Sequence, residues 1–272
     1  MTDKVWFITG ASKGLGREFT EAALERGDRV AACARNIAAL EPLSQRFGDR
    51  LLRLTLDVDD RAADFDAVNR AHDTFGRLDV VVNNAGYGHF GAFEELTETD
   101  LRDQLETNLF GAIWVTQAAL PHLRQQGNGH VVQVTSMAGV LAPPYLSAYN
   151  ASKWALEAMS ESLAAEVAAN GIKVTIVEPG PFGTDWAGPS ARTSEQLPQY
   201  DGLRQMTAKM QAAVTSGEPS AAAQALLAVV DAECPPLRVL FGSQALTFVT
   251  GVYEHRLKEW HDWANLSELA QG

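Results

Sequence analysis

The chain has 272 residues, of which 46% are hydrophobic, and its 34 acidic and 22 basic residues give a formal net charge of −12. A chain of this size can bury a large core, and we expect a single domain, residues 1–272. The acidic balance, without a stripe of Lys and Arg, argues against a nucleic-acid partner. No apolar run reaches the ~18 residues of a membrane span, and no signal-like segment precedes the first strand, so we expect a soluble, cytoplasmic protein. Two cysteines, Cys33 and Cys234, suit reduced thiols better than a disulfide framework.

Apolar, strand-like runs alternate with helical patterns along the chain. The seven runs are residues 4–9, 29–34, 51–56, 78–83, 129–135, 172–178 and 237–241. Residues 80–82 and 174–177 are continuously apolar or β-branched, which is typical of strands buried on both faces. The pattern predicts an α/β fold, a Rossmann-type doubly wound parallel sheet of about seven strands with helices on both faces.

A glycine-rich turn follows the first strand. Gly10, Gly14 and Gly16 lie between that strand and the helical pattern of residues 17–26. Glycines let the backbone turn tightly and approach a ligand, and the free N–H groups at a helix start favour a phosphate. The spacing is G-x-x-x-G-x-G rather than the commoner G-x-G-x-x-G, and alone it fits a plain strand-to-helix loop equally well.

Tyr149 and Lys153 lie in the stretch SAYNASK, residues 147–153. A spacing of four places the two side chains next to each other on a helix. A nearby cation favours the phenolate, so Lys153 is expected to lower the pKa of Tyr149 below its ordinary value of ~10 and make it a usable proton donor. An isolated Tyr-x-x-x-Lys pattern also recurs by chance. In that case the pair has only a structural role, in which the lysine stem covers the aromatic ring.

Together, the motifs resemble the short-chain dehydrogenase/reductase family, in its subgroup of compact single-domain oxidoreductases. The resemblance covers about residues 4–184. It is carried by residues 9–16 (TGASKGLG), Asp57, Val58, residues 83–86 (NNAG), Asn108, Ser136, Tyr149, Lys153, Pro179 and Gly180. It implies a nicotinamide cofactor and hydride transfer between that cofactor and a carbonyl or secondary alcohol.

The resemblance implies four catalytic residues. Tyr149 would donate a proton, Ser136 would hydrogen-bond the carbonyl oxygen, and Lys153 would hold the nicotinamide ribose. Asn108, within a helical run, would hold a water that links Lys153 to solvent. Taken singly, Ser136 could be a strand-end cap and Asn108 a surface polar residue; their joint occurrence with Tyr149 and Lys153 favours the catalytic interpretation.

The resemblance also implies the cofactor contacts. Asp57 and Val58 would contact the adenine, and Asn84, Ala85 and Gly86 the adenosine ribose and the middle of the cofactor. Thr184 would contact the cofactor amide, although such a threonine could equally cap a turn. The full expected set is Gly10, Ser12, Lys13, Gly14, Leu15, Gly16, Arg35, Asp57, Val58, Asn84, Ala85, Gly86, Tyr149, Lys153, Pro179, Gly180 and Thr184.

Cofactor choice depends on the end of the second strand. Ala34 stands where an NAD-specific site would carry an acidic residue, and Arg35 follows it. Arg35, with Lys13 in the glycine-rich turn, suits a 2′-phosphate, so we expect NADP(H). The histidines show no metal-ligand spacing, and no metal is expected.

Residues 137–146 and 181–186, which we expect around the substrate, are mostly apolar and indicate a hydrophobic pocket. Residues 181–220 are rich in Gly, Pro, Ser, Thr and Gln but carry Trp186 and Tyr200. Within them, at residues 185–215, we expect a variable substrate lid that orders over a bulky hydrophobic carbonyl; the alternative is a pair of permanently packed helices. The tail from residue 237 resembles, more loosely, the hydroxysteroid-dehydrogenase-like branch of the family.

The sequence therefore favours an NADP(H)-dependent ketone reductase for bulky hydrophobic substrates. The alternatives are an alcohol or hydroxysteroid dehydrogenase working in the oxidative direction, a cofactor-sensing regulator with an inactive site, and a nucleic-acid-binding Rossmann protein. In the family, two long helices, here about 98–125 and 148–169, commonly build a shared interface, so a homodimer or homotetramer is expected. Ala155, Ala158 and Ala165 would lie at this contact or in the core.

Overall fold

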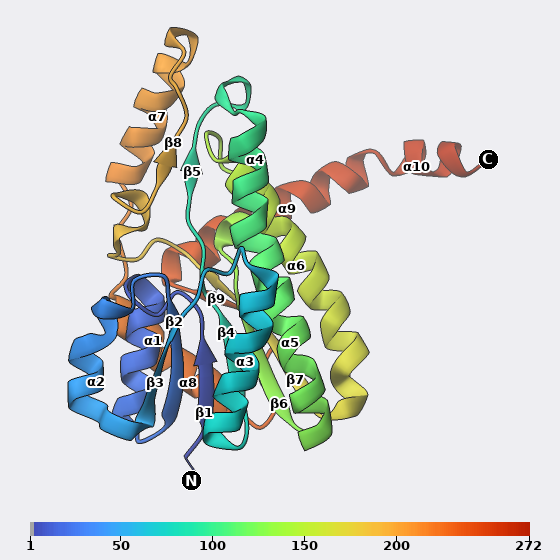
Figure 1. Ribbon diagram of the computed structural model, residues 1–272. Helices are drawn as coiled ribbons and strands as arrows, with labels where there is room; N and C mark the ends of the chain where they lie inside the picture. The colour runs from blue at the N-terminus through green and yellow to red at the C-terminus, as the bar shows by residue number, and fades with distance from the viewer. Residues whose placement is uncertain (1–2) are drawn as a thin grey trace.

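A seven-stranded, wholly parallel sheet forms the centre of the protein (Figure 1). The computed structural model describes residues 3–272. The strands of this sheet are β1 (Val5–Ile8), β2 (Arg29–Ala34), β3 (Leu51–Thr55), β4 (Val80–Asn83), β6 (Gly129–Val134), β7 (Ile172–Pro179) and β9 (Arg238–Phe241). Their order is β3-β2-β1-β4-β6-β7-β9, and every neighbouring pair is parallel. The predicted fold class is confirmed, with strand ends that differ from the prediction by no more than two residues.

Helices cover both faces of the sheet, and alternate residues of each strand pack against one or the other layer. In β1, Trp6 and Ile8 belong to one core cluster, whereas Val5 and Phe7 belong to the other. The first cluster lies under α1 (Gly14–Glu25), α2 (Glu41–Phe47) and α8 (Pro219–Asp231). The second lies under α3 (Arg61–Phe75), α5 (Gly111–Gln126) and α6 (Ser147–Val167).

The strand order reverses between β1 and β4. The chain leaves β1 toward β2 on one side and returns to β4 on the other, so the connections after these two strands diverge. In a doubly wound sheet this divergence opens a crevice at the carboxyl ends of the strands, where ligands bind. The backbone N–H of Thr9 donates to the Val82 carbonyl at 3.0 Å, which joins the two strand ends beside the crevice.

The long helical run predicted over residues 98–125 contains an interruption. It comprises α4 (Glu98–Leu105), a π-helical turn (Glu106–Phe110) and α5. Such wide turns are rare in proteins as a whole, but where they occur they often lie at functional sites. Asn108 lies in this turn and is almost fully buried, so it is not a surface polar residue.

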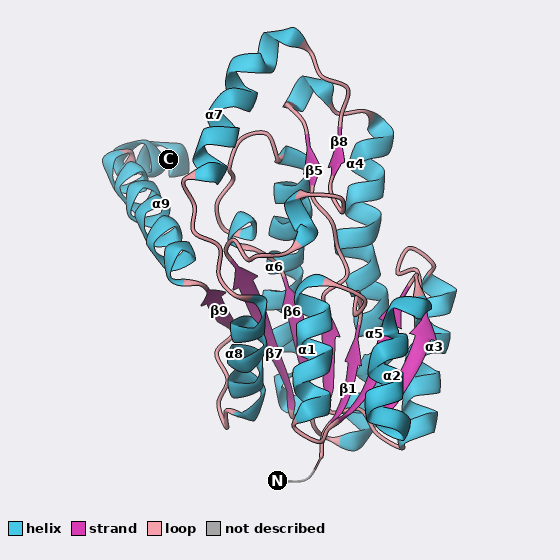
Figure 2. Cartoon of the chain, turned by 90° about the vertical axis from the view of Figure 1, so that its left-hand side faces the viewer, coloured by secondary structure: helices cyan, strands magenta, loops and turns pink. Residues whose placement is uncertain are grey.

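A second layer of structure rises above the carboxyl edge of the sheet (Figure 2). It contains a two-stranded parallel sheet, β5 (His89–Phe90) with β8 (Arg192–Thr193), and helix α7 (Asp201–Ala212). These short strands were not predicted, because two residues carry no periodic signal. At the C-terminal end, α9 (Ser243–Asp262) starts against the body, and its far end projects from it together with α10 (Ala264–Gln271) (Figure 1). Short 3-10 turns span Ile37–Leu40, Gly48–Arg50, Phe93–Glu95, Met137–Gly139, Ala168–Asn170, Asp185–Ala187 and Pro198–Tyr200.

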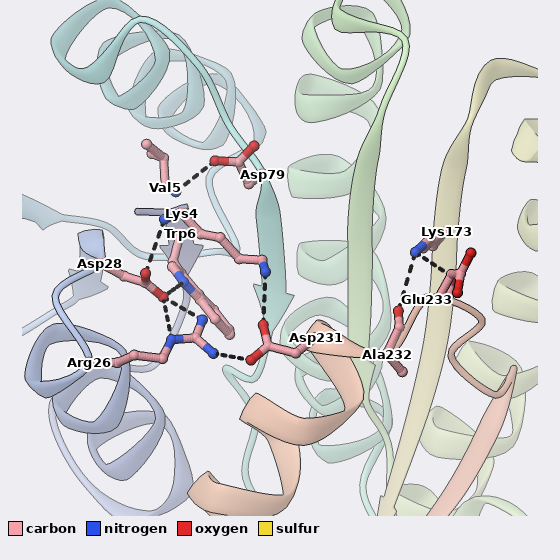
Figure 3. A network of polar contacts seen from close by, with 10 residues as sticks. All are labelled: Lys4, Val5, Trp6, Arg26, Asp28, Asp79, Lys173, Asp231, Ala232 and Glu233. Carbon is pink, nitrogen blue, oxygen red and sulfur yellow. Dashed lines mark hydrogen bonds and ion pairs between the residues drawn. The ribbon is translucent and has the colours of Figure 1, made fainter. Parts of the chain in front are cut away.

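A polar network ties the first strand to α1 and α8 at the opposite edge of the sheet (Figure 3). The buried Asp28 carboxylate accepts from Trp6 Nε1 at 2.8 Å and from the Arg26 guanidinium. Asp231, at the end of α8, pairs with Lys4 at 2.8 Å and with Arg26 at 2.7 Å. The network holds the end of α8 beside β1, far from the crevice.

Within residues 3–272, no helix is long and apolar enough to cross a membrane. The same residues contain no cluster of three or more His, Cys, Asp or Glu side chains arranged to hold a metal ion. Both cysteines are free thiols, Cys33 buried and Cys234 exposed.

Candidate active site

A cavity of about 1440 Å³ opens at the carboxyl ends of the strands, where the strand order reverses. Most of the predicted site residues line it. These are Gly10, Ser12, Lys13, Gly14, Leu15, Arg35, Asp57, Val58, Asn84, Ala85, Gly86, Ser136, Tyr149, Lys153, Pro179, Gly180 and Thr184. Gly16 and Asn108 do not line the cavity. They contact residues that do: Gly16 packs against Gly10 and Asn84, and Asn108 hydrogen-bonds Tyr87.

The glycine-rich turn packs directly on the turn after β4. Asn84 Nδ2 donates to the Thr9 carbonyl at 3.0 Å and to the Gly10 carbonyl at 3.3 Å. A Cβ at Gly16 would overlap both the Asn84 amide and the Gly10 carbonyl, so only glycine fits there. Helix α1 begins at Gly14 without a side-chain cap. Its first N–H groups are therefore free to hold an anion in the cavity.

Asn108 fixes the turn that follows β4. Its Oδ1 accepts from the Tyr87 N–H at 3.0 Å, and its Nδ2 donates to the Tyr87 carbonyl at 3.0 Å and to the Ser152 hydroxyl at 3.1 Å. Gly86 lies between Asn108 and Lys153: a Cβ there would be 3.0 Å from Asn108 Oδ1 and 3.5 Å from Lys153 Nζ. The π-helical turn thus brings Asn108 close to the lysine, with Gly86 between them.

Lys153 is buried on α6 and points toward the end of β6. Its Nζ donates to the Val134 carbonyl at 2.9 Å and lies 5.9 Å from the centroid of the Tyr149 ring. Burial lowers the pKa of Lys153 to about 8, and the charge of Glu157 opposes this fall. An ammonium with so low a pKa sits close to its titration point near neutral pH.

Burial raises the pKa of Tyr149 to about 12, and hydrogen bonding with Ser136 opposes the rise. The expected lowering of this pKa by Lys153 is therefore wrong for the protein alone. The physical reason is that the lysine directs its ammonium at the Val134 carbonyl, so the loss of hydration around the phenol dominates. Tyr149 keeps its proton at neutral pH and can act as a donor.

Ser136 and Thr184 both cap the turns that begin beside them. Ser136 Oγ accepts from the Ala138 N–H at 3.0 Å, and Thr184 Oγ1 accepts from the Trp186 N–H at 3.4 Å. Thr184 also lies against the glycine-rich turn, 3.7 Å from where a Cβ at Gly14 would be. Both residues therefore cap a turn and also line the cavity, so the two roles are compatible.

The two basic residues expected at a 2′-phosphate behave differently. Arg35 is exposed on the cavity wall, directly after the buried Ala34. Lys13 instead reaches the segment after β7, where it pairs with Asp185 at 3.0 Å and donates to the Ser190 hydroxyl. Asp185 offsets part of the charge of Lys13, which leaves Arg35 as the stronger candidate for an anionic group.

Aromatic rings gather at the substrate end of the cavity. Trp186 lies 4.9 Å from the Tyr149 ring and 5.7 Å from the Phe90 ring, measured between centroids. Tyr145 lines the same region with a φ of 69°, a left-handed conformation that is rare outside glycine and clusters at functional sites.

Helix α9 also contributes to the wall, through Phe248, Val252 and Arg256. This contribution could not be predicted from the sequence, because no local pattern shows that the start of a C-terminal helix lies against the cavity.

The sequence model of the family described as short chain dehydrogenase matches residues 4–196. The chain belongs to the short-chain dehydrogenase family. It is similar to Oxidoreductase BOA17 of Botryotinia fuckeliana, with 41% identity over 268 residues, 97% of this chain and 98% of the relative.

Solved structures agree with this assignment. A short-chain dehydrogenase from Streptomyces avermitilis is 41% identical, with a TM-score of 0.94 over 99% of this chain and 98% of that one. A short-chain dehydrogenase from Burkholderia cenocepacia, solved in complex with NADP, is 25% identical with a TM-score of 0.75, over 96% of this chain and 97% of that one. This short-chain dehydrogenase is therefore an oxidoreductase of a family that uses a nicotinamide cofactor.

Proposed function

We propose that this short-chain dehydrogenase is an NADP(H)-dependent ketone reductase for bulky, hydrophobic substrates. The observation that carries the proposal is the joint placement of Ser136, Tyr149 and Lys153 on the wall of one large cavity, with the uncapped start of α1 on the same wall. A proton donor, a carbonyl contact and a phosphate site are what hydride transfer to a ketone requires.

The cofactor site fits a phosphorylated dinucleotide. The free N–H groups of α1 suit the pyrophosphate, and the glycine contacts at residues 10 and 16 let the backbone approach it closely. Asp57, Val58 and Arg35 line the same cavity. Asp57 and Val58 would contact the adenine, and Arg35 would offer a planar, multi-donor cation to a 2′-phosphate. The cofactor, when bound, supplies or accepts the hydride.

The chain's own residues would handle the proton. Tyr149, with a pKa of about 12, stays protonated and donates to the substrate oxygen as negative charge develops there. Ser136 hydrogen-bonds the same oxygen. Lys153 would hold the nicotinamide ribose and lower the cost of the phenolate that forms, while Asn108 would hold a water beside the lysine.

The substrate class follows from the cavity lining. The cavity that Tyr149 lines includes apolar side chains from five separate segments. They include Phe90, Leu141, Pro143, Leu146, Trp186, Met210, Val214, Phe248 and Val252. A surface of this kind favours a large apolar ketone over a small polar one. The same residues would serve oxidation of the matching secondary alcohol, so a hydroxysteroid or other alcohol dehydrogenase is the alternative.

The test is the consumption of NADPH, followed by absorbance, against ketones, aldehydes and diketones of graded size. The proposal predicts turnover that rises with the apolar bulk of the ketone and is slower with NADH. A preference for small polar carbonyls would contradict the substrate class. An absence of turnover across the panel, together with tight NADPH binding, would favour the cofactor-sensing regulator.

We also propose that the enzyme forms a homodimer or homotetramer through the outer face of α6. Trp154, Ala158, Met159 and Ala165 are exposed on that helix, whereas Ala155 is half-buried against the neighbouring helix. An apolar stripe on an otherwise polar helix face is typical of a partner contact.

A further inference from the structure

A buried group of charged residues lies one helical turn beyond Lys153. Glu157 follows Lys153 by four residues on α6, so the two side chains share a face of the helix. Glu157 is 5% exposed, and the catalytic roles proposed above do not use it. A buried carboxylate is costly unless it is paired and hydrogen-bonded, so its presence behind the site calls for an explanation.

The contacts of Glu157 hold its carboxylate in one orientation. Oε1 accepts from the Thr135 hydroxyl at 2.5 Å, and Oε2 accepts from Arg238 Nε at 3.1 Å. Thr135 immediately precedes Ser136, and Arg238 begins β9. The carboxylate is thereby fixed between the end of β6, the edge strand and α6.

Lys153 has no direct carboxylate partner. Among the side chains of residues 3–272, none with an acidic group forms an ion pair with its ammonium within 4.0 Å. Glu157 is nevertheless the charge that acts on it, and it opposes the effect of burial on the lysine pKa. A nearby anion in a dry interior favours the charged form of its neighbour.

We infer that Glu157 is a positioning residue for the reaction proposed above: its fixed carboxylate keeps Lys153 protonated inside the buried site. Thr135 and Arg238 hold that carboxylate in place. Because the inference rests on Lys153 having the role in the proposed function, its test must first show that the unmodified enzyme turns over.

Other charged groups face the same region. Glu178 on β7 lies 3.7 Å from Arg238, and burial together with the charge of Glu157 raises the pKa of Glu178 to about 7. Glu161 on α6 pairs with Arg238 at 2.7 Å on the exposed side. Arg238 is therefore shared among three carboxylates and is not the partner of Glu157 alone. Burial raises the pKa of Glu157, whereas the hydrogen bond from Thr135 and the charge of Arg238 lower it and favour the ionised carboxylate.

The experiment compares E157Q with E161Q and E157D. E161Q is the matched control, because it removes an acidic partner of Arg238 from the same helix but from an exposed position. For each variant, turnover of NADPH with a ketone and the dissociation constant of NADPH are measured from pH 6 to pH 10, and folding is checked by circular dichroism.

Without Glu157 the lysine loses its proton at lower pH. We expect the alkaline limb of the turnover profile, and the loss of NADPH affinity with rising pH, to move down by about one pH unit in E157Q. E161Q should leave both limbs in place. E157D, which keeps the charge, should recover most of the shift, whereas a residue needed only for packing would be rescued no better by Asp than by Gln.

Unshifted limbs in a folded E157Q would overturn the inference, and equal shifts in E157Q and E157D would do the same. An unmodified enzyme that binds NADPH but shows no turnover would refute the proposed function instead. Should E157Q not fold, T135V takes its place, because it deletes the hydrogen bond to Oε1 and should move the limbs in the same direction by a smaller amount. Unmoved limbs in T135V would then count against the inference.

Discussion

Arg35 carries the proposed choice of NADP(H) over NAD(H). It is exposed on the cavity wall, and the residue before it, Ala34, has no acidic group for a ribose hydroxyl. Arg35→Asp removes a charge-assisted contact and adds repulsion toward a 2′-phosphate. One such contact is worth about 1.5–3 kcal/mol, so NADPH should bind at least about tenfold more weakly while NADH changes little.

The measurement is the dissociation constant of each cofactor by protein fluorescence. Arg124→Asp serves as the control, since this arginine lies in the last turn of α5, at the opposite edge of the sheet from the cavity. Equal losses of NADPH and NADH affinity in Arg35→Asp would show that the arginine does not select the phosphate.

Asp64 on α3 links stability to pH. Its side chain is fully buried, and within the described part of the chain neither carboxylate oxygen has a hydrogen-bond partner. Burial raises the pKa of Asp64 to about 8, and the nearby carboxylates of Asp60, Asp59 and Asp57 act in the same direction. The folded protein therefore keeps a proton that the unfolded chain has already released above pH ~4.

The unfolded state binds fewer protons than the native state in this window, so the free energy of unfolding should fall as the pH rises from 5 to 8. Asp64→Asn, which cannot ionise, should reduce that fall by more than about 1.4 kcal/mol, the equivalent of one pKa unit. Urea unfolding at a series of pH values measures it. Asp66→Asn, at an exposed position of α3, is the control, and an undiminished pH dependence in Asp64→Asn would contradict the account.

Specific polar contacts hold residues 185–215 against the body of the protein. The buried Glu95 carboxylate pairs with Arg204 of α7 at 2.6 Å and accepts from the Leu197 N–H at 2.8 Å. His89 and Ser194 share a hydrogen bond of 2.8 Å across β5 and β8. These contacts hold the segment against the body, although it contains one α-helix, α7, rather than the pair of helices in the alternative. We propose that the lid moves as one unit on these anchors.

Hydrogen exchange tests the lid. We predict that NADPH with a ketone inhibitor increases protection of residues 185–215, and that the largest gain falls at 185–191, where Lys13 reaches Asp185 and Ser190. Arg204→Gln breaks a buried pair and should speed exchange of α7, whereas Arg192→Gln breaks an exposed pair with Asp103 and should change little. Protection that is the same with and without ligands would rule out the lid.

The architecture of the whole molecule follows from local sequence signals. Continuous apolar runs bounded by glycine mark strands buried on both faces, and their alternation with helices leaves few topologies available. The resemblance to the short-chain dehydrogenase/reductase family implies that Gly10, Asn84, Tyr149 and Lys153 belong to one site, and the four residues line the same cavity. The sequence could therefore predict the sheet and the wall of the cavity.

What the sequence could not predict depends on contacts between distant segments. The pairing of Lys13 with Asp185, 172 residues apart, follows only from how the chain after β7 packs on the glycine-rich turn. The raised pKa of Tyr149 depends on how completely the folded chain removes water from the phenol. Likewise, Glu157 meets Arg238 across 81 residues, so no pattern along α6 could show that the two lie together.

The proposed assembly places the exposed apolar face of α6 against a second copy of the chain. Met159→Glu puts a charge in that face, so it should convert the oligomer to smaller species by light scattering coupled to size exclusion. Met206→Glu is the control, because this methionine is similarly exposed but lies on α7. An unchanged mass for Met159→Glu would place the interface elsewhere.

The central claim is that the buried Tyr149 gives a proton to a ketone that receives a hydride from NADPH. The most direct measurement supplies NADPH deuterated at the transferable position of the nicotinamide ring and follows the label into the alcohol product by mass spectrometry. Because Phe keeps the ring but has no proton to give, Tyr149→Phe should fold and bind NADPH as the unmodified enzyme does. We predict deuterium on the carbinol carbon with the unmodified enzyme and a loss of at least about a hundredfold in labelled product with Tyr149→Phe. NADPH consumption without deuterium in the alcohol, or undiminished labelling by Tyr149→Phe, would contradict the account.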